Sequence, residues 1–184
     1  MKLLKPAWIF LFFLAFPIPS FATWSIIIID SGTKEIGIAG ASCTYNCYGI
    51  GQIVPGKGAI IVQAMSNKEA RDKGLEMIEA GFSPAKIVAA LRDPIYDPER
   101  QQYAVVCLNY PNDPATYTGA TTHPHRGTLT ASGVSVQVNT LTTENELKAI
   151  VKGHYGSGFK GATTGFANGR NFDACPGGWF RGWW

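Results

Sequence analysis

Four consecutive isoleucines, Ile26 to Ile29, stand out in the pattern of apolar and polar positions along this chain. A continuous apolar run of this kind is typical of a β-strand that is buried on both faces. Similar apolar stretches, bounded by Gly, Pro, Asn or Asp, recur along the chain. Together they predict strands at residues 24–30, 35–42, 49–54, 59–64, 102–109, 116–119 and 134–139.

Helical spacing replaces the strand pattern in two regions. Each region contains a capping box, in which a Ser or Thr is followed three residues later by Glu. The boxes are Ser66 with Glu69 and Thr143 with Glu146, and a further helix start is predicted at Ser83-Pro84. The predicted helices run from Ser66, as N-cap, to Gly81, from Pro84 to the Asp93-Pro94 pair, and from Thr143 through Val151.

The order of strands, two helices, strands and a helix is typical of an α+β domain with antiparallel sheets and helices on the outside. Hydrophobic residues make up 46% of the 184 positions, which excludes a wholly disordered chain and fits one domain. The net charge is +3, and no five like charges occur in a row. The composition therefore gives no support for a nucleic-acid partner.

Residues 1–22 have the order of a secretory signal peptide: two lysines, an apolar stretch, then small residues before a cut. Ser20 and Ala22 occupy the −3 and −1 positions of a cut between Ala22 and Thr23. The apolar stretch has about half of the ~20 residues that a membrane span needs, so an uncleaved anchor is the weaker alternative. We expect an exported protein, periplasmic or secreted, with no stable membrane span after cleavage.

Cleavage would leave a domain at residues 23–152 and a tail at residues 153–184. The tail is rich in glycine and aromatic residues and ends Gly-Gly-Trp-Phe-Arg-Gly-Trp-Trp. Two interpretations stay open for it. It is an aromatic surface segment, or the domain is interrupted and its C-terminal end is truncated. We favour the second, because so few strand and helix formers rarely complete a core.

Export also affects the interpretation of the four cysteines, Cys43, Cys47, Cys107 and Cys175. An even number of cysteines outside the cytosol suggests disulfides, and the short Cys43–Cys47 loop is one candidate pair. Buried thiols are the alternative. No Cys or His pairs have the spacing of a zinc site, and we interpret His123 and His125 as part of a solvated loop. We therefore predict no metal, and no cofactor motif is present.

Thr23 would become the first residue of the mature chain. A threonine hydroxyl alone is a poor nucleophile, but an α-amine with a pKa of ~7.7–8.0 is partly neutral near pH 7. The free amine of Thr23 would then act as the base for the hydroxyl of the same residue. An exported protein can also begin with Thr by chance, so this feature carries little weight by itself.

An ordered set of short motifs strengthens the interpretation of Thr23 as a nucleophile. It includes Thr23-Trp24-Ser25-Ile26, residues 35–42 (EIGIAGAS), Val62-Gln63-Ala64 with Asn67, residues 79–83 (EAGFS), Arg100-Gln101, Thr118-Gly119 and Val138-Asn139-Thr140-Leu141. This set resembles the DUF1028 family, which is placed in the Ntn-hydrolase superfamily, over residues 23–141. The resemblance implies a four-layer αββα sandwich and an N-terminal nucleophile at Thr23.

The resemblance also implies candidate site residues. Asn139 would donate to an oxyanion, Ser42 would bond near the α-amine, and Arg100 would bind a substrate carboxylate. Gln63, Asn67 and Gln101 match polar positions of the family pattern. A structural role is the alternative for each, such as helix capping by Asn67 or a surface ion pair for Arg100. The chain departs from the family at Val138, where Gly is common, and in its cysteines at 43 and 47.

Two functions follow from the sequence. The first is an exported amidohydrolase in which Thr23 attacks a small-molecule or peptide amide. The second is a non-catalytic envelope or secreted module for binding or adhesion. The sequence names neither the substrate nor the oligomeric state.

Overall fold

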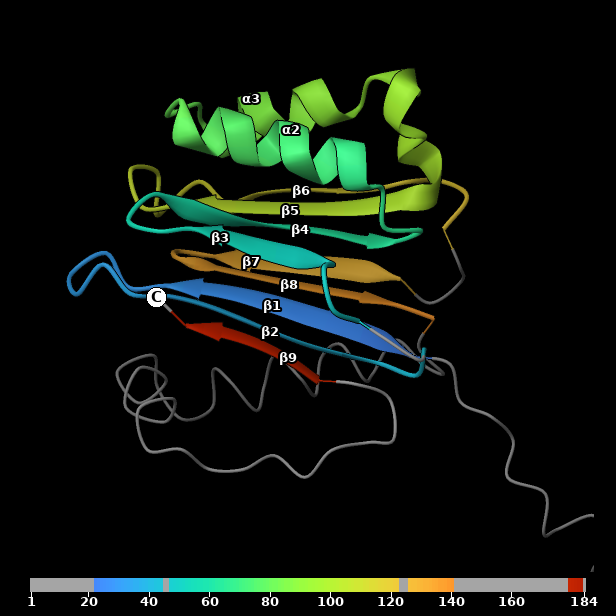
Figure 1. The fold of residues 1–184 in the computed structure, drawn as a ribbon, viewed down its shortest axis with the longest axis horizontal. Helices are drawn as coiled ribbons and strands as arrows, with labels where there is room; N and C mark the ends of the chain where they lie inside the picture. The colour runs from blue at the N-terminus through green and yellow to red at the C-terminus, as the bar shows by residue number, and fades with distance from the viewer. Residues whose placement is uncertain (1–21, 45–46, 123–125, 141–178, 184) are drawn as a thin grey trace, which may run out of the picture.

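The computed structural model describes residues 22–44, 47–122, 126–140 and 179–183 (Figure 1). The predicted signal segment before residue 22, the pair His123 and His125, and the predicted helix at residues 143–151 lie outside the described residues. Most of the predicted tail lies outside them as well. No helix in the described part of the chain is long and apolar enough to cross a membrane.

Within the described residues, nine strands form two antiparallel sheets. They are β1 Thr23–Ile29, β2 Ile36–Ser42, β3 Gly51–Val54, β4 Gly58–Ala64, β5 Gln101–Cys107, β6 Ala115–Thr118, β7 Gly127–Ala131, β8 Val134–Asn139 and β9 Trp179–Trp183. The five-stranded sheet has the order β7-β8-β1-β2-β9, and the four-stranded sheet has the order β3-β4-β5-β6. The two sheets lie face to face (Figure 1). The isoleucine-rich strand β1 is therefore the central strand of the larger sheet.

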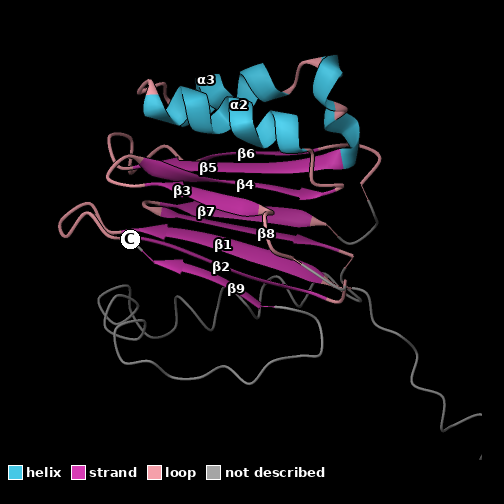
Figure 2. Ribbon diagram, viewed as in Figure 1, coloured by secondary structure: helices cyan, strands magenta, loops and turns pink. Residues whose placement is uncertain are grey.

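Two α-helices, α2 Lys68–Glu79 and α3 Pro84–Leu91, pack on the outer face of the four-stranded sheet (Figure 2). Two short 3-10 helices, η1 Pro94–Tyr96 and η2 Pro98–Arg100, lead from α3 into β5. The expected four-layer αββα sandwich is thus wrong, because the described residues form one helical layer and two sheets. The helices follow β4 and precede β5, which are neighbours in one sheet, so both helices return to that sheet.

The face shared by the two sheets is apolar at one end. Ile27 and Ile29 of β1 pack there with Ile36 and Ile38 of β2 and with Ile61 of β4. Ile26 and Ile28, which alternate with them along the strand, belong to a separate cluster on the other face of β1. The isoleucine run therefore supplies both faces of its strand, as its pattern predicts.

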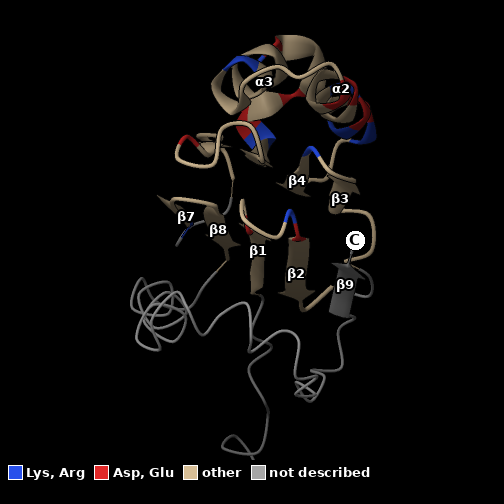
Figure 3. Cartoon of the chain, turned by 90° about the vertical axis from the view of Figure 1, so that its left-hand side faces the viewer, with Lys and Arg blue, Asp and Glu red and all other residues tan. Residues whose placement is uncertain are grey.

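A second core lies between the four-stranded sheet and the helices, and it includes Ile60, Val62, Ile87, Leu91 and Tyr103. A Cβ atom on Gly74 of α2 would come within 2.1 Å of Ile60 Cδ1, so glycine allows this helix its close approach to β4. Charged residues are frequent on the helices and rare on the strands (Figure 3). This distribution fits a helical layer that faces water.

Several strand ends differ from the sequence prediction by one or two residues, and the start of α2 differs as well. The N-cap of α2 is Asn67 and not Ser66, because Asn67 Oδ1 accepts from Ala70 N at 2.9 Å. Ser66 instead has a left-handed backbone with φ of 51°. Strand β7 was not predicted, since its sequence GTLTA has a single large apolar residue, Leu129.

Candidate active site at the polar end of the two sheets

Three predicted site residues meet where the central strand begins. Thr23 is the first residue of β1, and its direct partners are Ser42 on β2 and Asn139 on β8. The Thr23 Oγ1 atom lies 2.9 Å from Ser42 Oγ. Ser42 and Asn139 are buried, whereas Thr23 is partly exposed. Three segments that are far apart in sequence thus place two hydroxyls and one amide together.

The hydrogen-bond partners of Ser42 determine which hydroxyl donates. Ser42 Oγ accepts from Thr44 N at 3.3 Å and from Thr44 Oγ1 at 2.9 Å. A hydroxyl has two lone pairs and one hydrogen, so the Ser42 hydrogen is the one left for Thr23. Thr23 Oγ1 therefore accepts from Ser42. The hydrogen of Thr23 itself is then available to its own α-amine once that amine is free.

A layer of buried polar side chains continues inward from Thr23. Ser25, two residues along β1, donates from Oγ to Gln63 Oε1 on β4 at 2.5 Å. Gln63 Nε2 donates to Gln102 Oε1 on β5 at 2.8 Å, and Asn139 Nδ2 donates to the same oxygen at 3.0 Å. These bonds connect the two sheets. We call the buried polar residues that face one another here the inter-sheet polar layer: Ser25, Gln63, Gln102, Ser135, Gln137 and Asn139.

Every buried polar side chain in the described residues is neutral. Burial of a charge without a partner is costly, whereas a buried amide is tolerated when its hydrogen bonds are satisfied. Among the described residues, no three His, Cys, Asp or Glu side chains gather as a metal site would require. The residues around Thr23 thus offer hydroxyls and amides as the groups that can act on a ligand.

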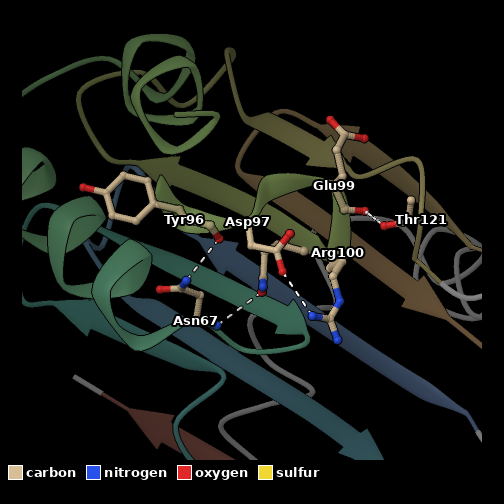
Figure 4. Close-up of polar contacts among 7 residues, drawn as sticks. Asn67, Tyr96, Asp97, Glu99, Arg100 and Thr121 are labelled. Atoms are coloured by element: carbon tan, nitrogen blue, oxygen red, sulfur yellow. Dashed lines mark hydrogen bonds and ion pairs between the residues drawn. The ribbon is translucent and has the colours of Figure 1, made fainter. Parts of the chain in front are cut away.

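Asn67 makes structural contacts in a neighbouring loop, where it bonds to Tyr96 (Figure 4), and it also contacts Gln101. Asn67 caps α2, and its Nδ2 donates to Tyr96 O at 3.0 Å. Gln101 is buried, and its Oε1 accepts from Asn67 N at 3.2 Å. These bonds tie the start of α2 to the start of β5. They match the structural alternative that the sequence left open for Asn67.

Arg100 lies on the same loop and pairs with Asp97 at 3.3 Å (Figure 4). Both side chains are about half exposed, at 54% and 52%. An exposed pair of this kind contributes little to stability, about 0–1 kcal/mol. Nearby, the Glu99 carboxylate accepts from Tyr117 and from Ala120 N, which holds the pKa of Glu99 below its ordinary value. Arg100 therefore has the surface ion pair that its alternative role predicts.

Strained backbone gathers around this end of the sheets. Ala64, Ser66, Asp97 and Thr140 all have positive φ, between 51° and 74°. Ala64 ends β4 one residue after Gln63, and Thr140 directly follows Asn139. A positive φ is unusual for a β-branched residue such as Thr140, and strain of about 1–3 kcal/mol per residue is found mostly at functional sites. The strain supports a site at this end.

The sequence prediction missed Ser25, Gln102, Ser135 and Gln137. The sequence does contain a signal for Ser135 and Gln137. They lie on β8, whose sequence VSVQVN alternates apolar and polar residues. Alternation of this kind usually indicates a strand with one face in water. All six residues of β8 are buried, so the polar face meets the opposite sheet instead.

The Cys43–Cys47 disulfide is not formed in the structure, where Cys43 is an exposed free thiol. Cys107 is a buried free thiol, and burial raises its pKa to about 11. Cys107 lies next to a cavity of about 240 Å³ at the end of α2, which Lys57, Glu79 and Phe82 also line. Because Cys107 and Lys57 mark the far ends of β5 and β4 from Gln102 and Gln63, this cavity is not part of the Thr23 site.

The fold and the site together define a layered protein of two antiparallel sheets, with a threonine at the start of the central strand and a polar layer behind it. The model of a family of unknown function, DUF1028, matches residues 23–161. The chain belongs to the DUF1028 family, which confirms the resemblance seen in its motifs.

The chain is also similar to the crystal structure of a DUF1028 protein from Silicibacter pomeroyi. The two share 23% sequence identity, with a TM-score of 0.62, over 71% of this chain. At this identity the likeness concerns the fold alone. The match spans 58% of the other protein's length. No curated protein matches this chain.

Proposed function

We propose that this protein is an exported amidohydrolase and that Thr23, freed by removal of the leader, is its nucleophile. One observation carries the proposal: the Thr23 hydroxyl is hydrogen-bonded to Ser42, and Thr23 lies opposite Asn139 at the start of the central strand. The family match also begins at residue 23, the residue that the predicted cut would expose.

The proposed reaction uses groups at one end of β1. The α-amine takes the Thr23 hydroxyl proton as Oγ1 attacks the carbonyl carbon of the amide. The carbonyl electrons move onto oxygen, and an N–H of Asn139 donates to that oxyanion. The C–N bond then breaks, and the leaving amine takes the proton from the α-ammonium group. Water hydrolyses the resulting ester and restores the Thr23 hydroxyl.

The hydrogen bond from Ser42 supports this role for Thr23. A donor that faces Oγ1 stabilises negative charge on that oxygen as its proton leaves. Because the buried side chains nearby are neutral, the α-amine would be the group that titrates beside Oγ1. The reactivity of Thr23 is therefore expected to rise with pH through the α-amine pKa, ~7.7–8.0, and then to level off.

The first test is the N-terminal sequence and intact mass of the exported protein. An unblocked Thr23 is the expected N-terminus. The processed protein is then treated with p-nitrophenyl acetate, and acetylation of the Thr23 hydroxyl is located by mass spectrometry after the α-amine has been assigned separately. Thr23→Ser keeps the hydroxyl and is expected to react, whereas Thr23→Ala is expected to lose the modification.

Two results would overturn the proposal. One is a mature chain that starts elsewhere or has a blocked amine, because no self-activated threonine would then exist. The other is acetylation of hydroxyl groups to the same extent in the wild type and in Thr23→Ala, because Thr23 would then not be the reactive residue. In either case the alternative, an exported module for binding or adhesion, would replace the amidohydrolase.

A further inference from the structure

Gln102 of β5 has the largest number of side-chain hydrogen bonds in the inter-sheet polar layer. Its Oε1 accepts from Gln63 Nε2 at 2.8 Å and from Asn139 Nδ2 at 3.0 Å. Its Nε2 donates to Thr118 Oγ1 at 3.1 Å and to Val138 O at 3.0 Å. An amide side chain has two acceptor sites and two donor hydrogens, so all four are used.

The bond to Val138 fixes which way this amide faces. A backbone carbonyl oxygen only accepts, so the nitrogen of Gln102 must be the atom that faces Val138 O. The oxygen of Gln102 must then face Gln63 and Asn139. A reversed amide would place two acceptors against each other at 3.0 Å and two donors against each other on the opposite side.

The orientation of Gln102 in turn fixes the amide of Asn139. Asn139 Nδ2 faces Gln102, and Asn139 Oδ1 accepts from Thr140 Oγ1 at 3.0 Å. One of the two Nδ2 hydrogens is used by Gln102. The other hydrogen belongs to the same planar group, so its direction is set as well. Asn139 is the direct strand partner of Thr23.

We propose that Gln102 is the positioning residue of this site, and that it holds the second N–H of Asn139 toward the carbonyl oxygen of an acyl group on Thr23. The proposal rests on the proposed function. Gln102 itself does not contact the reacting atoms; it acts through Asn139. Loss of orientation of a donor is expected to slow acylation of Thr23 by about 10- to 100-fold.

The test compares two buried glutamines of the same layer. Gln102→Met removes the four bonds, whereas Gln137→Met is the matched control. Gln137 is equally buried and lies on β8, but it bonds to Ser25 and Ser135 and not to Asn139. Both variants lose a buried amide and are expected to lose stability, Gln102→Met more because it loses more hydrogen bonds. Only Gln102→Met is expected to slow the acetylation of Thr23 by p-nitrophenyl acetate.

A second variant covers the case in which Gln102→Met does not fold. Gln102→Glu has nearly the same shape, and burial is expected to keep its acid protonated, so that it offers an oxygen to Asn139 and an O–H donor to Val138 O. It is expected to acetylate Thr23 within about threefold of the wild type. A Gln102→Glu protein that folds but reacts as slowly as Thr23→Ala would contradict the proposal, as would equal rates in Gln102→Met and Gln137→Met.

A second readout separates this proposal from the proposed function. The Asn139 side-chain NH₂ is expected to give a pair of signals in ¹⁵N NMR of the whole processed protein. Those signals are expected to shift in Gln102→Met and to stay in place in Gln137→Met. Unchanged signals in Gln102→Met would overturn the positioning role, whatever the rates. Shifted signals together with no acetylation of the wild-type Thr23 would leave Gln102 as the residue that orients Asn139 and would reject the amidohydrolase.

Discussion

The Ser42 hydroxyl shows how the chemistry of one residue depends on its neighbours. In the sequence Ser42 is the small residue that ends an apolar stretch. In the structure its two bonds from Thr44 leave its hydrogen for Thr23 Oγ1. The direction of this bond follows from counting donors and acceptors. The nucleophile proposed here is therefore an acceptor on one side, and its own proton is left to the α-amine.

The different exposure of two cysteines can be tested by alkylation. Cys43 is exposed, whereas Cys107 is buried and has a pKa raised to about 11. Near pH 8 about one Cys107 thiol in a thousand is then ionised, and only the thiolate reacts quickly. Iodoacetamide is expected to modify Cys43 in the native protein and to modify Cys107 only after unfolding. Peptide mapping by mass spectrometry measures both sites.

Unfolding in guanidinium chloride before alkylation provides the control, since it should expose both thiols equally. Native labelling of Cys107 as fast as Cys43 would contradict its burial in β5. A Cys43 that resists alkylation until a reductant is added would instead indicate a disulfide, as the sequence alone suggested.

At the scale of elements, the two helices begin in different ways. Asn67 caps α2 through its side chain, and it also bonds to Tyr96 O and to Gln101. Ser83 occupies the same position in α3 and makes no such cap bond. The cap of α2 thus ties the helical layer to the loop before β5, at the end of the sheets that holds Thr23.

This difference gives a matched pair of variants. Asn67→Ala is expected to lower the free energy of unfolding by about 1–2 kcal/mol, because it removes the cap and leaves the backbone N–H of the buried residue Ala70 without its partner. Ser83→Ala is expected to change it by less than about 0.5 kcal/mol. Urea unfolding, followed by circular dichroism, measures both. Equal losses of unfolding free energy in the two variants would show that the side-chain cap of Asn67 does not stabilise the protein more than Ser83 does.

Strand β8 shows why the elements were easier to predict than their surroundings. Its alternating sequence predicts a strand, and the observed bounds of 134–139 agree. The same alternation suggests that Ser135 and Gln137 face water. They are fully buried instead, because the four-stranded sheet covers that face, and Gln137 accepts a hydrogen bond from Ser25 of the neighbouring strand β1. Local pattern decides the strand, whereas the packing of a second sheet decides what the strand faces.

At the scale of the molecule, the space between the sheets has two halves. One half is filled by isoleucines and other apolar residues, and the other by the inter-sheet polar layer. The apolar half supplies the hydrophobic stability of the sandwich. The polar half is tolerated because its amides bond to one another across the sheets, since an unsatisfied buried amide costs about 1–3 kcal/mol.

Hydrogen exchange tests this arrangement for the molecule as a whole. Strands β4 and β5 lie between the helices and the other sheet, and nearly all of their residues are buried. Strands β6 and β7 lie at sheet edges and consist of partly exposed residues. Backbone amides of β4 and β5 are expected to exchange slowest, and those of β6 and β7 much faster. Deuterium uptake measured by mass spectrometry on the native protein gives the order.

A uniform exchange rate across the four strands would argue against a core centred on β4 and β5. Slow exchange in β7 would instead mean that this edge is covered in solution. The Thr23→Ala variant is a suitable control for the experiment, because the loss of one partly exposed hydroxyl at the end of β1 should leave the order of the strands unchanged.

The sequence by itself determined most strands, the two described helices, the family and the residue at which the family match begins. These features depend on local periodicity, on capping residues and on short motifs, which are all contained in neighbouring positions. Only the tertiary structure decided that both helices share one sheet and that Gln102, rather than Gln101, bonds to Asn139. The reason is physical. Adjacent residues of a strand point to opposite faces, so the sheet that covers each face decides which of two neighbouring glutamines reaches the site.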